Sequence, residues 1–425
     1  MKRVGVEVKR TFVDAGASVA ITGVGPVSAL GTGADAFFDA LVGGRSGTRA
    51  LSRCAPPARG CAIAAEVAEP APLPLDPANP MPRAVQLALH AARLAMADAR
   101  FEGDRERVGV VVGTGVGNVD LIEAAAETMR LGRRLSPATA FRAFSHAAAC
   151  EIVRDLDLRG PISTVTSGCN SGADAIGQAL DWLRLGRADA VLVGGTEAEL
   201  VPTFLSMMTA ARALAVRYNG RPEDGSRPFD NGRDGNVPGE GAGFMLLENA
   251  ACAERRKARV RATLRGYASR SVGRRADYDP FNPVFDPAPM LRTLRAALAD
   301  AGVTPAQLSA ISANGSSSVF YDVVEATAIA ELLGERSERT PVHSIKAALG
   351  QTGAVTPALQ TIAAALSVER GVIPPTRNLV EQDARVKLNL VRHAPLHGPV
   401  DTVLCNAIGF GGFYYSALVV GRAES

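Results

Sequence analysis

The most informative part of the sequence is Thr164-Val165-Thr166-Ser167-Gly168-Cys169-Asn170-Ser171-Gly172-Ala173-Asp174. A β-branched run stops at Gly168, Cys169 follows in a turn, and a helix that starts with small residues begins directly afterwards. Such a turn directs backbone N–H groups and the positive end of the helix dipole toward the sulfur, which favours the thiolate. Taken alone, the pattern fits either a nucleophilic cysteine or a small buried thiol at a tight strand-to-helix junction.

Strand and helix patterns alternate on both sides of this turn. Short β-branched runs predict strands at 19–22, 108–112, 162–166 and 190–193, and later at 261–267, 308–313, 342–345 and 403–408. Apolar residues at helical spacing predict helices at 83–99, 172–185, 289–301, 322–333 and 357–369. The alternation predicts an α/β protein built from two βαβ-rich halves, residues 1–250 and 251–425.

The composition is that of a globular chain, with 425 residues, 47% hydrophobic content and a formal net charge of +3. Only five histidines and six cysteines are present, and the cysteines lack CxxC spacing, so we expect reduced thiols and no metal site. No apolar run reaches the roughly 18 to 20 residues of a membrane helix, and the first residues lack the apolar core of a signal peptide. We therefore expect a cytoplasmic protein without a membrane span. Aromatic residues make up only 5% of the chain, which argues against nucleic-acid binding.

Further motifs follow the cysteine turn along the chain. They are Arg227-Pro228-Phe229-Asp230 with Arg233-Asp234-Gly235, Gly239-Glu240-Gly241-Ala242-Gly243, and Asn406-Ala407-Ile408-Gly409-Phe410-Gly411-Gly412. Together with the cysteine turn, these segments resemble the RPFD…RDG…GEGAG and NxFGFGG signatures of the β-ketoacyl synthase family, in the family's order. The resemblance implies the thiolase-like fold of fatty-acid and type II polyketide condensing enzymes, a layered αβαβα core of two similar halves.

The resemblance also implies which groups would assist a nucleophilic cysteine. Cys169 would carry an acyl chain, and the backbone N–H groups of Cys169 and Phe410 would form an oxyanion hole for attack on the thioester. Phe410 would gate the acyl pocket from a substrate-binding loop that includes Gly409 and Gly411.

Four polar residues receive supporting roles from the same resemblance. Lys346 would pair with Glu325 and hold the floor of the site. Ser316 and Ser318 would hold the phosphopantetheine arm of an acyl carrier protein, which serves as a substrate arm, and no bound cofactor is implied.

Both catalytic histidines of that family are replaced in this chain. The HGTST segment reads Asn314-Gly315-Ser316-Ser317-Ser318, and the KxxxGH segment ends in Gln351. Neither amide gains or loses a proton near pH 7, so acid–base help worth about a hundred- to ten-thousandfold in rate should be absent. We expect decarboxylative condensation to be weak or lost, while acylation of Cys169 survives. His343 or His146 could substitute only if the fold brought an imidazole into the site.

Three functions remain open from the sequence. The first is an acyltransferase that takes an acyl chain from a carrier-protein thioester onto Cys169. The second is a non-condensing partner that resembles a chain-length factor and pairs with an intact ketosynthase. The third is a decarboxylative condensing enzyme with an unusual Cys-Asn-Gln site. In each case the expected partners are an acyl carrier protein and a second chain, in a homodimer or in a heterodimer with another ketosynthase.

Overall fold

The computed structural model describes residues 18–70, 75–76, 78–273 and 285–423. The strands of the first half are β1 (Val19–Ser28), β2 (Gly31–Thr32), β5 (Val108–Gly113), β6 (Ile162–Val165), β7 (Ala190–Ala198) and β8 (Glu240–Glu248). The strands of the second half are β9 (Ala262–Ser271), β10 (Ala310–Ser312), β11 (Pro341–His343), β13 (Asn389–Leu390), β15 (Thr402–Ile408) and β16 (Tyr414–Gly421). In the described residues these strands form one 12-stranded mixed sheet, in the order β13-β11-β10-β15-β16-β9-β1-β8-β7-β5-β6 with β2 beside β1.

The two halves of the sheet repeat one topology. In the first half β5 pairs in parallel with β6 and β7, and β8 and then β1 continue the sheet antiparallel. In the second half β10 pairs in parallel with β11 and β15, and β16 and then β9 continue it antiparallel. The halves join where β1 pairs with β9. The repeat confirms the predicted pair of similar βαβ-rich halves.

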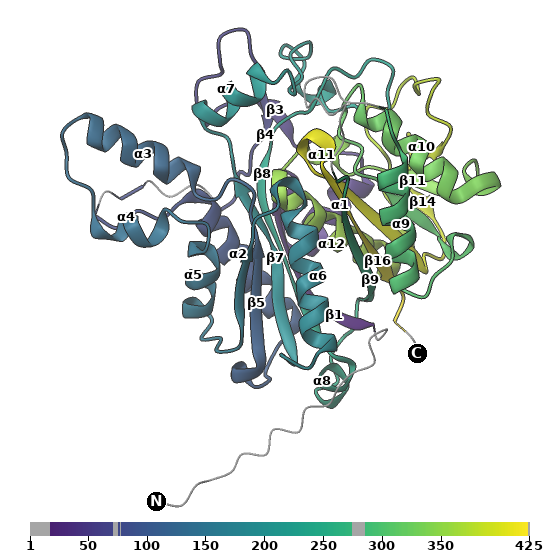
Figure 1. Cartoon of the computed structure of the whole chain (residues 1–425), viewed down its shortest axis with the longest axis horizontal. Helices are drawn as coiled ribbons and strands as arrows, with labels where there is room; N and C mark the ends of the chain where they lie inside the picture. The colour runs from purple at the N-terminus through teal and green to yellow at the C-terminus, as the bar shows by residue number, and fades with distance from the viewer. Residues whose placement is uncertain (1–17, 71–74, 77, 274–284, 424–425) are drawn as a thin grey trace, which may run out of the picture.

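Helices divide the fold into layers (Figure 1). The central helices α6 (Ser171–Arg184) and α12 (Thr356–Arg370) pack on strands of both halves and on each other, so they form a buried middle layer. On the outside of the first half lie α2 (Arg83–Ala99) and α5 (Ala147–Asp155), and on the outside of the second half lies α9 (Ala288–Asp300), with α10 (Tyr321–Leu333) beside it. The result is the predicted layered α/β core.

One glycine brings the starts of the two central helices together. A Cβ at Gly172 would lie 2.4 Å from the carbonyl oxygen of Ala354, so only glycine permits this approach. Gly172 follows the cysteine turn closely in the chain, whereas Ala354 lies three residues after Gln351. The contact therefore places the Cys169 turn against the Gln351 loop.

The sequence patterns located most of these elements but missed some. Strands β8 and β16 were not predicted, because both are glycine- or alanine-containing and almost entirely buried, so they lack the polar–apolar alternation of a half-exposed strand. A lobe formed by α3 (Val119–Arg130) and α4 (Pro137–Arg142) projects from the first half, on the left of Figure 1. The remaining elements are α1 (Ala34–Val42), α7 (Pro202–Ala210), α8 (Ala250–Arg255), α11 (Lys346–Leu349), and the two-strand ribbons β3 (Thr48–Ala50) with β4 (Ile63–Ala65) and β12 (Val372–Ile373) with β14 (Leu396–His397).

Among the described helices, none is both long and apolar enough to cross a bilayer.

Candidate active site

Cys169 lies in the short 3-10 helix η2 (Gly168–Asn170) between β6 and α6, as the sequence predicted. The turn is fixed by its neighbours, because Ser171 Oγ donates to the carbonyl oxygen of Gly168 at 2.6 Å and accepts from the backbone N–H of Ser167 at 2.9 Å. The Cys169 side chain is half-buried and opens onto a cavity of about 550 Å³. The nucleophile candidate is thus held rigidly and remains accessible.

The loop that carries Phe410 lies directly over the sulfur. A hydrogen bond from the Phe410 backbone N–H reaches Cys169 and lowers the pKa of its thiol, which places one of the two predicted oxyanion donors at the nucleophile. The loop turns tightly because Gly411 has a φ of 79°. Gly409, Phe410 and Gly411 all line the cavity, and the Phe410 side chain is 54% exposed.

Tyr414 holds these two loops together and was not singled out from the sequence. Its hydroxyl oxygen lies 3.1 Å from the point that a Gly168 Cβ would occupy, and its ring lies 2.7 Å from the corresponding point at Gly409. Any side chain at either glycine would therefore push the cysteine turn and the Phe410 loop apart. No local sequence pattern predicts the packing of Tyr414 on the cysteine turn, because this contact joins segments that are far apart in the sequence.

Asn314 accepts a hydrogen bond from Lys346, and this contact corrects the predicted partner of Lys346. The sequence predicted that Lys346 pairs directly with Glu325, but Lys346 Nζ donates to Asn314 Oδ1 at 2.6 Å. The Glu325 carboxylate instead accepts from the backbone N–H groups of Asn314 and Gly315, at 2.6 and 2.7 Å, and from Asn406 Nδ2. Glu325 acts on Lys346 only through longer-range attraction. The reason for the difference is that Asn314 Oδ1 lies within hydrogen-bond distance of the ammonium, whereas the Glu325 carboxylate is occupied by the N–H groups of Asn314, Gly315 and Asn406.

The orientation of the Asn314 amide follows from its partners. Both Lys346 Nζ and the backbone N–H of Ile408, the latter at 3.2 Å, direct donors at the same Asn314 atom. Two donors require an oxygen there, so the Asn314 NH₂ group is the part left for the cavity that Asn314 lines. Asn314 is therefore a fixed hydrogen-bond donor.

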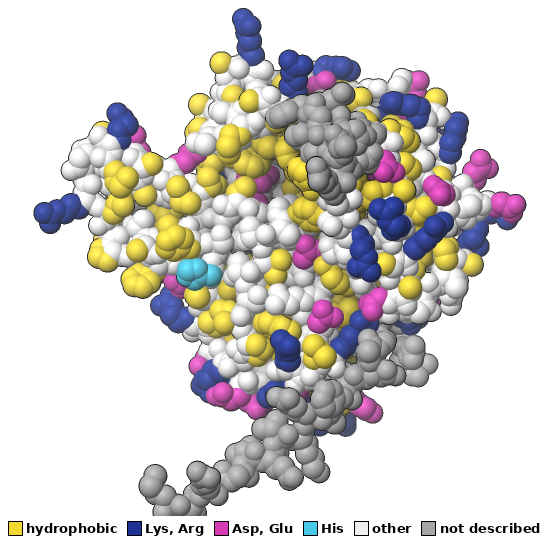
Figure 2. Space-filling model, viewed as in Figure 1, with side chains coloured by type: hydrophobic (Ala, Val, Ile, Leu, Met, Phe, Trp, Pro, Cys, Tyr) yellow, Lys and Arg dark blue, Asp and Glu magenta, His cyan; other side chains and the backbone are white. Residues whose placement is uncertain are grey.

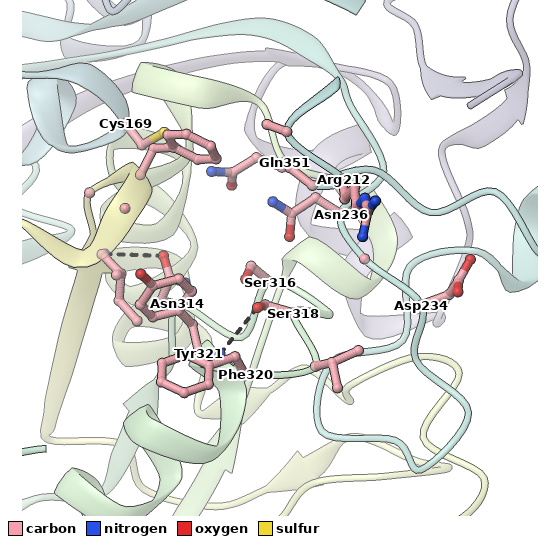
Figure 3. A pocket seen from close by; sticks show the side chains of 18 of the residues that line it. Cys169, Arg212, Asp234, Asn236, Asn314, Ser316, Ser318, Phe320, Tyr321 and Gln351 are labelled. Atoms are coloured by element: carbon pink, nitrogen blue, oxygen red, sulfur yellow. Dashed lines mark hydrogen bonds between the residues drawn. The ribbon is translucent and has the colours of Figure 1, made fainter. Parts of the chain in front are cut away.

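Gln351 lines the same cavity and lies between Cys169 and Asn236 in Figure 3. Its backbone N–H donates to the carbonyl oxygen of Val237 at 2.7 Å, and its own carbonyl accepts from the N–H of Gly239 at 2.9 Å. Its side-chain Oε1 is buried without a hydrogen-bond partner in the described residues. The structure thus places both amide replacements, Asn314 and Gln351, in one cavity with Cys169.

The two predicted arm-binding serines also line this cavity. The backbone N–H of Ser316 donates to Asp322 Oδ1 at 2.9 Å, and Ser318 Oγ accepts from the backbone N–H of Tyr321 at 3.1 Å. Asp322 and Glu325 both project from α10. This helix therefore positions the whole segment from Asn314 to Ser318.

The protonation of Cys169 differs from the sequence prediction. The helix N-terminus was expected to favour the thiolate, but burial and the negative charge of Glu199 raise the pKa of the Cys169 thiol to about 11. Lys346 and the Phe410 N–H oppose that rise without cancelling it. Burial also lowers the pKa of Lys346 to about 8. Near neutral pH the resting nucleophile is a thiol.

Two buried carboxyls that no motif pointed to, Glu197 and Glu199, act on Cys169 through their charge and raise the pKa of its thiol. The Glu197 carboxylate accepts from the backbone N–H groups of Gly115 and Val116 at 2.7 and 3.2 Å, so the turn after β5 binds a carboxylate of the protein itself. Oxygens of both carboxyls lie within 3.2 Å of the point that a Gly353 Cβ would take. Burial raises the pKa of Glu197 to about 7, and burial together with repulsion from Glu197 raises the pKa of Glu199 well above its usual value.

No histidine replaces the missing imidazoles among the described residues that line the cavity. His343 is 2% exposed on β11, and burial lowers its pKa to about 4. His146 lies at the N-cap position of α5 without a capping hydrogen bond from its side chain, and its ring stacks on Phe144. Two residues that the sequence did not single out do line the cavity, Arg212 and Asn236.

Comparisons with protein families cover most of the chain. The N-terminal domain of β-ketoacyl synthases matches residues 17–253, and the C-terminal domain matches residues 261–380. The tetracenomycin polyketide synthase ketoacyl synthase alpha subunit of Streptomyces glaucescens is 36% identical, over 96% of this chain and 98% of its own. The 3-oxoacyl-[acyl-carrier-protein] synthase 2 of Coxiella burnetii is 33% identical, over 93% and 96%.

Solved structures of ketosynthases share the fold. A ketosynthase in complex with its type II polyketide synthase acyl-carrier protein superposes with a TM-score of 0.86 at 28% identity, covering 96% of this chain and 99% of that one. The ishigamide ketosynthase/chain length factor gives a TM-score of 0.86 at 31% identity with the same coverage. These similarities confirm the thiolase-like fold predicted from the motifs.

Proposed function

Since the chain belongs to the β-ketoacyl synthase family, we propose that it is a ketosynthase-like acyltransferase of a polyketide or fatty-acid-type pathway. It accepts an acyl chain from a carrier-protein thioester onto Cys169, and decarboxylative condensation is weak or lost. The observation that carries this proposal is the position of Cys169. Its sulfur opens onto the cavity and already receives the Phe410 N–H.

The loading step needs only groups that remain in this chain. Cys169 attacks the thioester carbon, the C–S bond to the carrier breaks, and the carrier thiol takes up the proton that Cys169 lost. The backbone N–H groups of Cys169 and Phe410 stabilise the oxyanion, a contribution of about 3 kcal/mol for each donor of this kind. Such transfer requires no imidazole in principle, although a thiol with a pKa of about 11 loads slowly at neutral pH.

Condensation demands more than the amides provide. Decarboxylation of a malonyl unit builds an enolate, which charge-assisted donors stabilise about twice as strongly as neutral donors do. Asn314 presents an NH₂ group that its bonds to Lys346 and Ile408 hold in place, so it donates a hydrogen bond but transfers no proton. The amide of Gln351 has the same limitation.

The acyl donor in this proposal is a phosphopantetheine thioester on an acyl carrier protein. Ser316 and Ser318 line the cavity where the arm would pass. One similar ketosynthase was solved in complex with its carrier protein, which supports the same class of donor here.

A second protein chain completes the proposed assembly. Strand β6 is the edge of the sheet next to the nucleophile, and its Ile162 is 46% exposed. The α3–α4 lobe exposes large apolar side chains, among them Met129 and Phe141, and Phe144 just after α4 is exposed as well. Hydrophobic side chains gather over this lobe on the left of Figure 2. An open strand edge beside exposed apolar side chains favours pairing with another chain, either a second copy or another ketosynthase.

A second candidate function is a non-condensing partner of an intact ketosynthase. The presence of Asn314 and Gln351 beside Cys169 in the cavity favours it, because a partner that does not condense acyl units needs no titratable group at these positions. A similar solved structure is a ketosynthase/chain length factor.

Intact-mass measurement with an acyl carrier thioester separates these functions. Acyl transfer predicts a stable adduct on the full chain that disappears in Cys169→Ala. If no adduct forms at pH 7 to 9 and the chain co-purifies with a second ketosynthase, the partner function replaces the acyltransferase.

A further inference from the structure

A carboxylate on α6 joins the cysteine turn to two strands of the second half. Asp174 lies in the first turn of this helix. Its Oδ1 accepts from the Tyr267 hydroxyl on β9 at 2.8 Å and from Ser416 Oγ on β16 at 2.6 Å. Its Oδ2 accepts from Ser167 Oγ, in the turn just before Cys169. Hydrogen bonds to a carboxylate are stronger than those between neutral groups, so Asp174 holds these three hydroxyls firmly.

Ser416 extends the network to the other side of Cys169. Its hydroxyl oxygen accepts from Asn170 Nδ2 at 3.0 Å. Asn170 is 0% exposed and Ser416 is 1% exposed, so water cannot replace this bond. Asp174 is therefore bonded to the residues on both sides of Cys169, directly at Ser167 and through Ser416 at Asn170.

The strand that carries Ser416 also carries the loop of Phe410. Strand β16 begins at Tyr414, directly after the turn Phe410–Gly412. The Gly409 N–H donates to the carbonyl oxygen of Tyr414 at 3.1 Å, which closes the loop onto the start of the strand. A displacement of β16 would therefore also displace the Phe410 N–H.

Close packing fixes the third hydroxyl of the network. A Cβ at Gly177, one turn after Asp174 on α6, would lie 2.3 Å from two ring carbons of Tyr267. Only glycine lets the Tyr267 ring lie this close to the helix, within reach of the Asp174 carboxylate. The carboxylate is thus restrained from β9 as well as from β16.

From these contacts we propose that Asp174 is a positioning residue for the oxyanion hole. Its carboxylate holds the cysteine turn against β16, so that the backbone N–H groups of Cys169 and Phe410 point at one oxyanion. Such donors act only when they are aimed in advance at the charge that develops, and a displacement of about 1 Å can cost a hundredfold in rate. The role rests on the proposed function, because acylation of Cys169 forms this oxyanion.

Two reactions of the same sulfur separate positioning from general stability. With p-nitrophenyl acetate, a C–S bond forms through a tetrahedral oxyanion, the ester C–O bond breaks and p-nitrophenolate leaves. With iodoacetamide, a C–S bond forms and iodide leaves without an oxyanion. The buffer takes up the thiol proton in both reactions. Because both consume the thiolate, the ratio of their rates at one pH does not depend on the pKa of Cys169. Cys169→Ala gives the blank for each reagent.

The variants change the network at two points. Asp174→Asn keeps the shape of the side chain but replaces one acceptor oxygen with NH₂. We expect it to lower the ratio of acylation to alkylation about tenfold, because the Phe410 N–H shifts but is not lost. Ser416→Ala removes the link from the carboxylate to β16 and should lower the ratio as well, so the test stands even if Asp174→Asn does not fold. Asp181→Asn, at an exposed position of α6, is the matched control and should keep the ratio.

Three results would overturn the proposal. The first is an equal change of both rates or an unchanged ratio in the folded variants, and the second is an equal effect of Asp181→Asn. The third is an unmodified chain that iodoacetamide alkylates at Cys169 but the ester does not acylate. The carrier-protein assay remains separate. If the ester acylates Cys169 and carrier thioesters do not, the proposed function is wrong and the positioning role stands.

Discussion

Lys346 Nζ donates to Asn314 Oδ1 across 2.6 Å, and this bond organises the site in which two imidazoles are missing. Lys346 is 2% exposed, so the ammonium depends on that oxygen in place of water. The same ammonium also lowers the pKa of the Cys169 thiol by attraction. One cation thus orients the Asn314 amide and favours the nucleophilic form of Cys169.

Replacement of this cation tests both effects. Lys346→Met should raise the pKa of Cys169 and slow its alkylation by iodoacetamide several-fold at pH 8, because the nearest positive charge is removed. Alkylation is followed by intact mass, with Cys169→Ala as the blank. The melting temperature serves as the control for folding and should fall, because the variant removes a donor from Asn314 Oδ1 and the positive charge near the buried carboxyls Asp322 and Glu325. An unchanged alkylation rate in a folded variant would contradict the electrostatic role.

The alkylation of Cys169 should depend steeply on pH. The thiolate is the reactive form. Because the pKa of Cys169 is about 11, the thiolate fraction grows about tenfold with each unit of increase in pH, as long as the pH stays below the pKa. We therefore expect nearly tenfold faster alkylation at pH 8 than at pH 7. A plateau below pH 8 would show a more acidic thiol than the structure implies.

Glu199 should oppose the formation of the thiolate. Glu199→Gln removes a buried negative charge that raises the pKa of Cys169, so alkylation should accelerate. The difference from the unmodified chain should widen as pH rises, because Glu199 loses its own proton only well above its ordinary pKa. Glu123→Gln, outside the cavity lining, is the matched control and should change nothing. Slower alkylation in Glu199→Gln would instead indicate that Glu199 accepts the thiol proton.

Malonyl decarboxylation should be slow in this chain. Without an acid–base group, the rate should be about a hundredfold or more below that of a ketosynthase with both histidines. Release of carbon dioxide from malonyl carrier protein measures it, and an Asn314→His plus Gln351→His variant should gain activity. If the unmodified chain decarboxylates the malonyl unit at an ordinary rate and the double variant is no faster, Asn314 and Gln351 are sufficient for decarboxylation.

His343 should make the fold sensitive to acid. Burial lowers its pKa from 6.5 to about 4, so the unfolded chain binds the proton first as pH falls. Neutral His343 makes its full contribution to the free energy of unfolding above about pH 6.5. As pH falls toward 4, that free energy decreases by up to about 3 kcal/mol. His343→Gln should lack this loss in denaturant unfolding at pH 4.5 and 7. An identical pH dependence in both chains would rule out His343 as the source.

The agreement between sequence and structure is greatest where the signal is local. The strand, turn and helix around Cys169 are short-range patterns, and the structure has them within one or two residues of the predicted bounds. The cavity also contains Asn314, Gln351, Ser316, Ser318 and Phe410, which were chosen by motif. Tyr414, Arg212 and Asn236 escaped notice because their positions depend on loops packed against distant segments, for which no periodicity exists.

By itself, the sequence determined the family's motif order, a cysteine at a strand-to-helix turn, and the replacement of two imidazoles by amides that cannot titrate. Those features follow from residue chemistry and from local backbone preference. Only the tertiary structure decided that Lys346 bonds to Asn314 and not to Glu325, and that the Cys169 thiol stays protonated beside Glu199. The physical reason is that hydrogen bonds, desolvation and charge act through space, between groups that the fold brings together from distant parts of the chain.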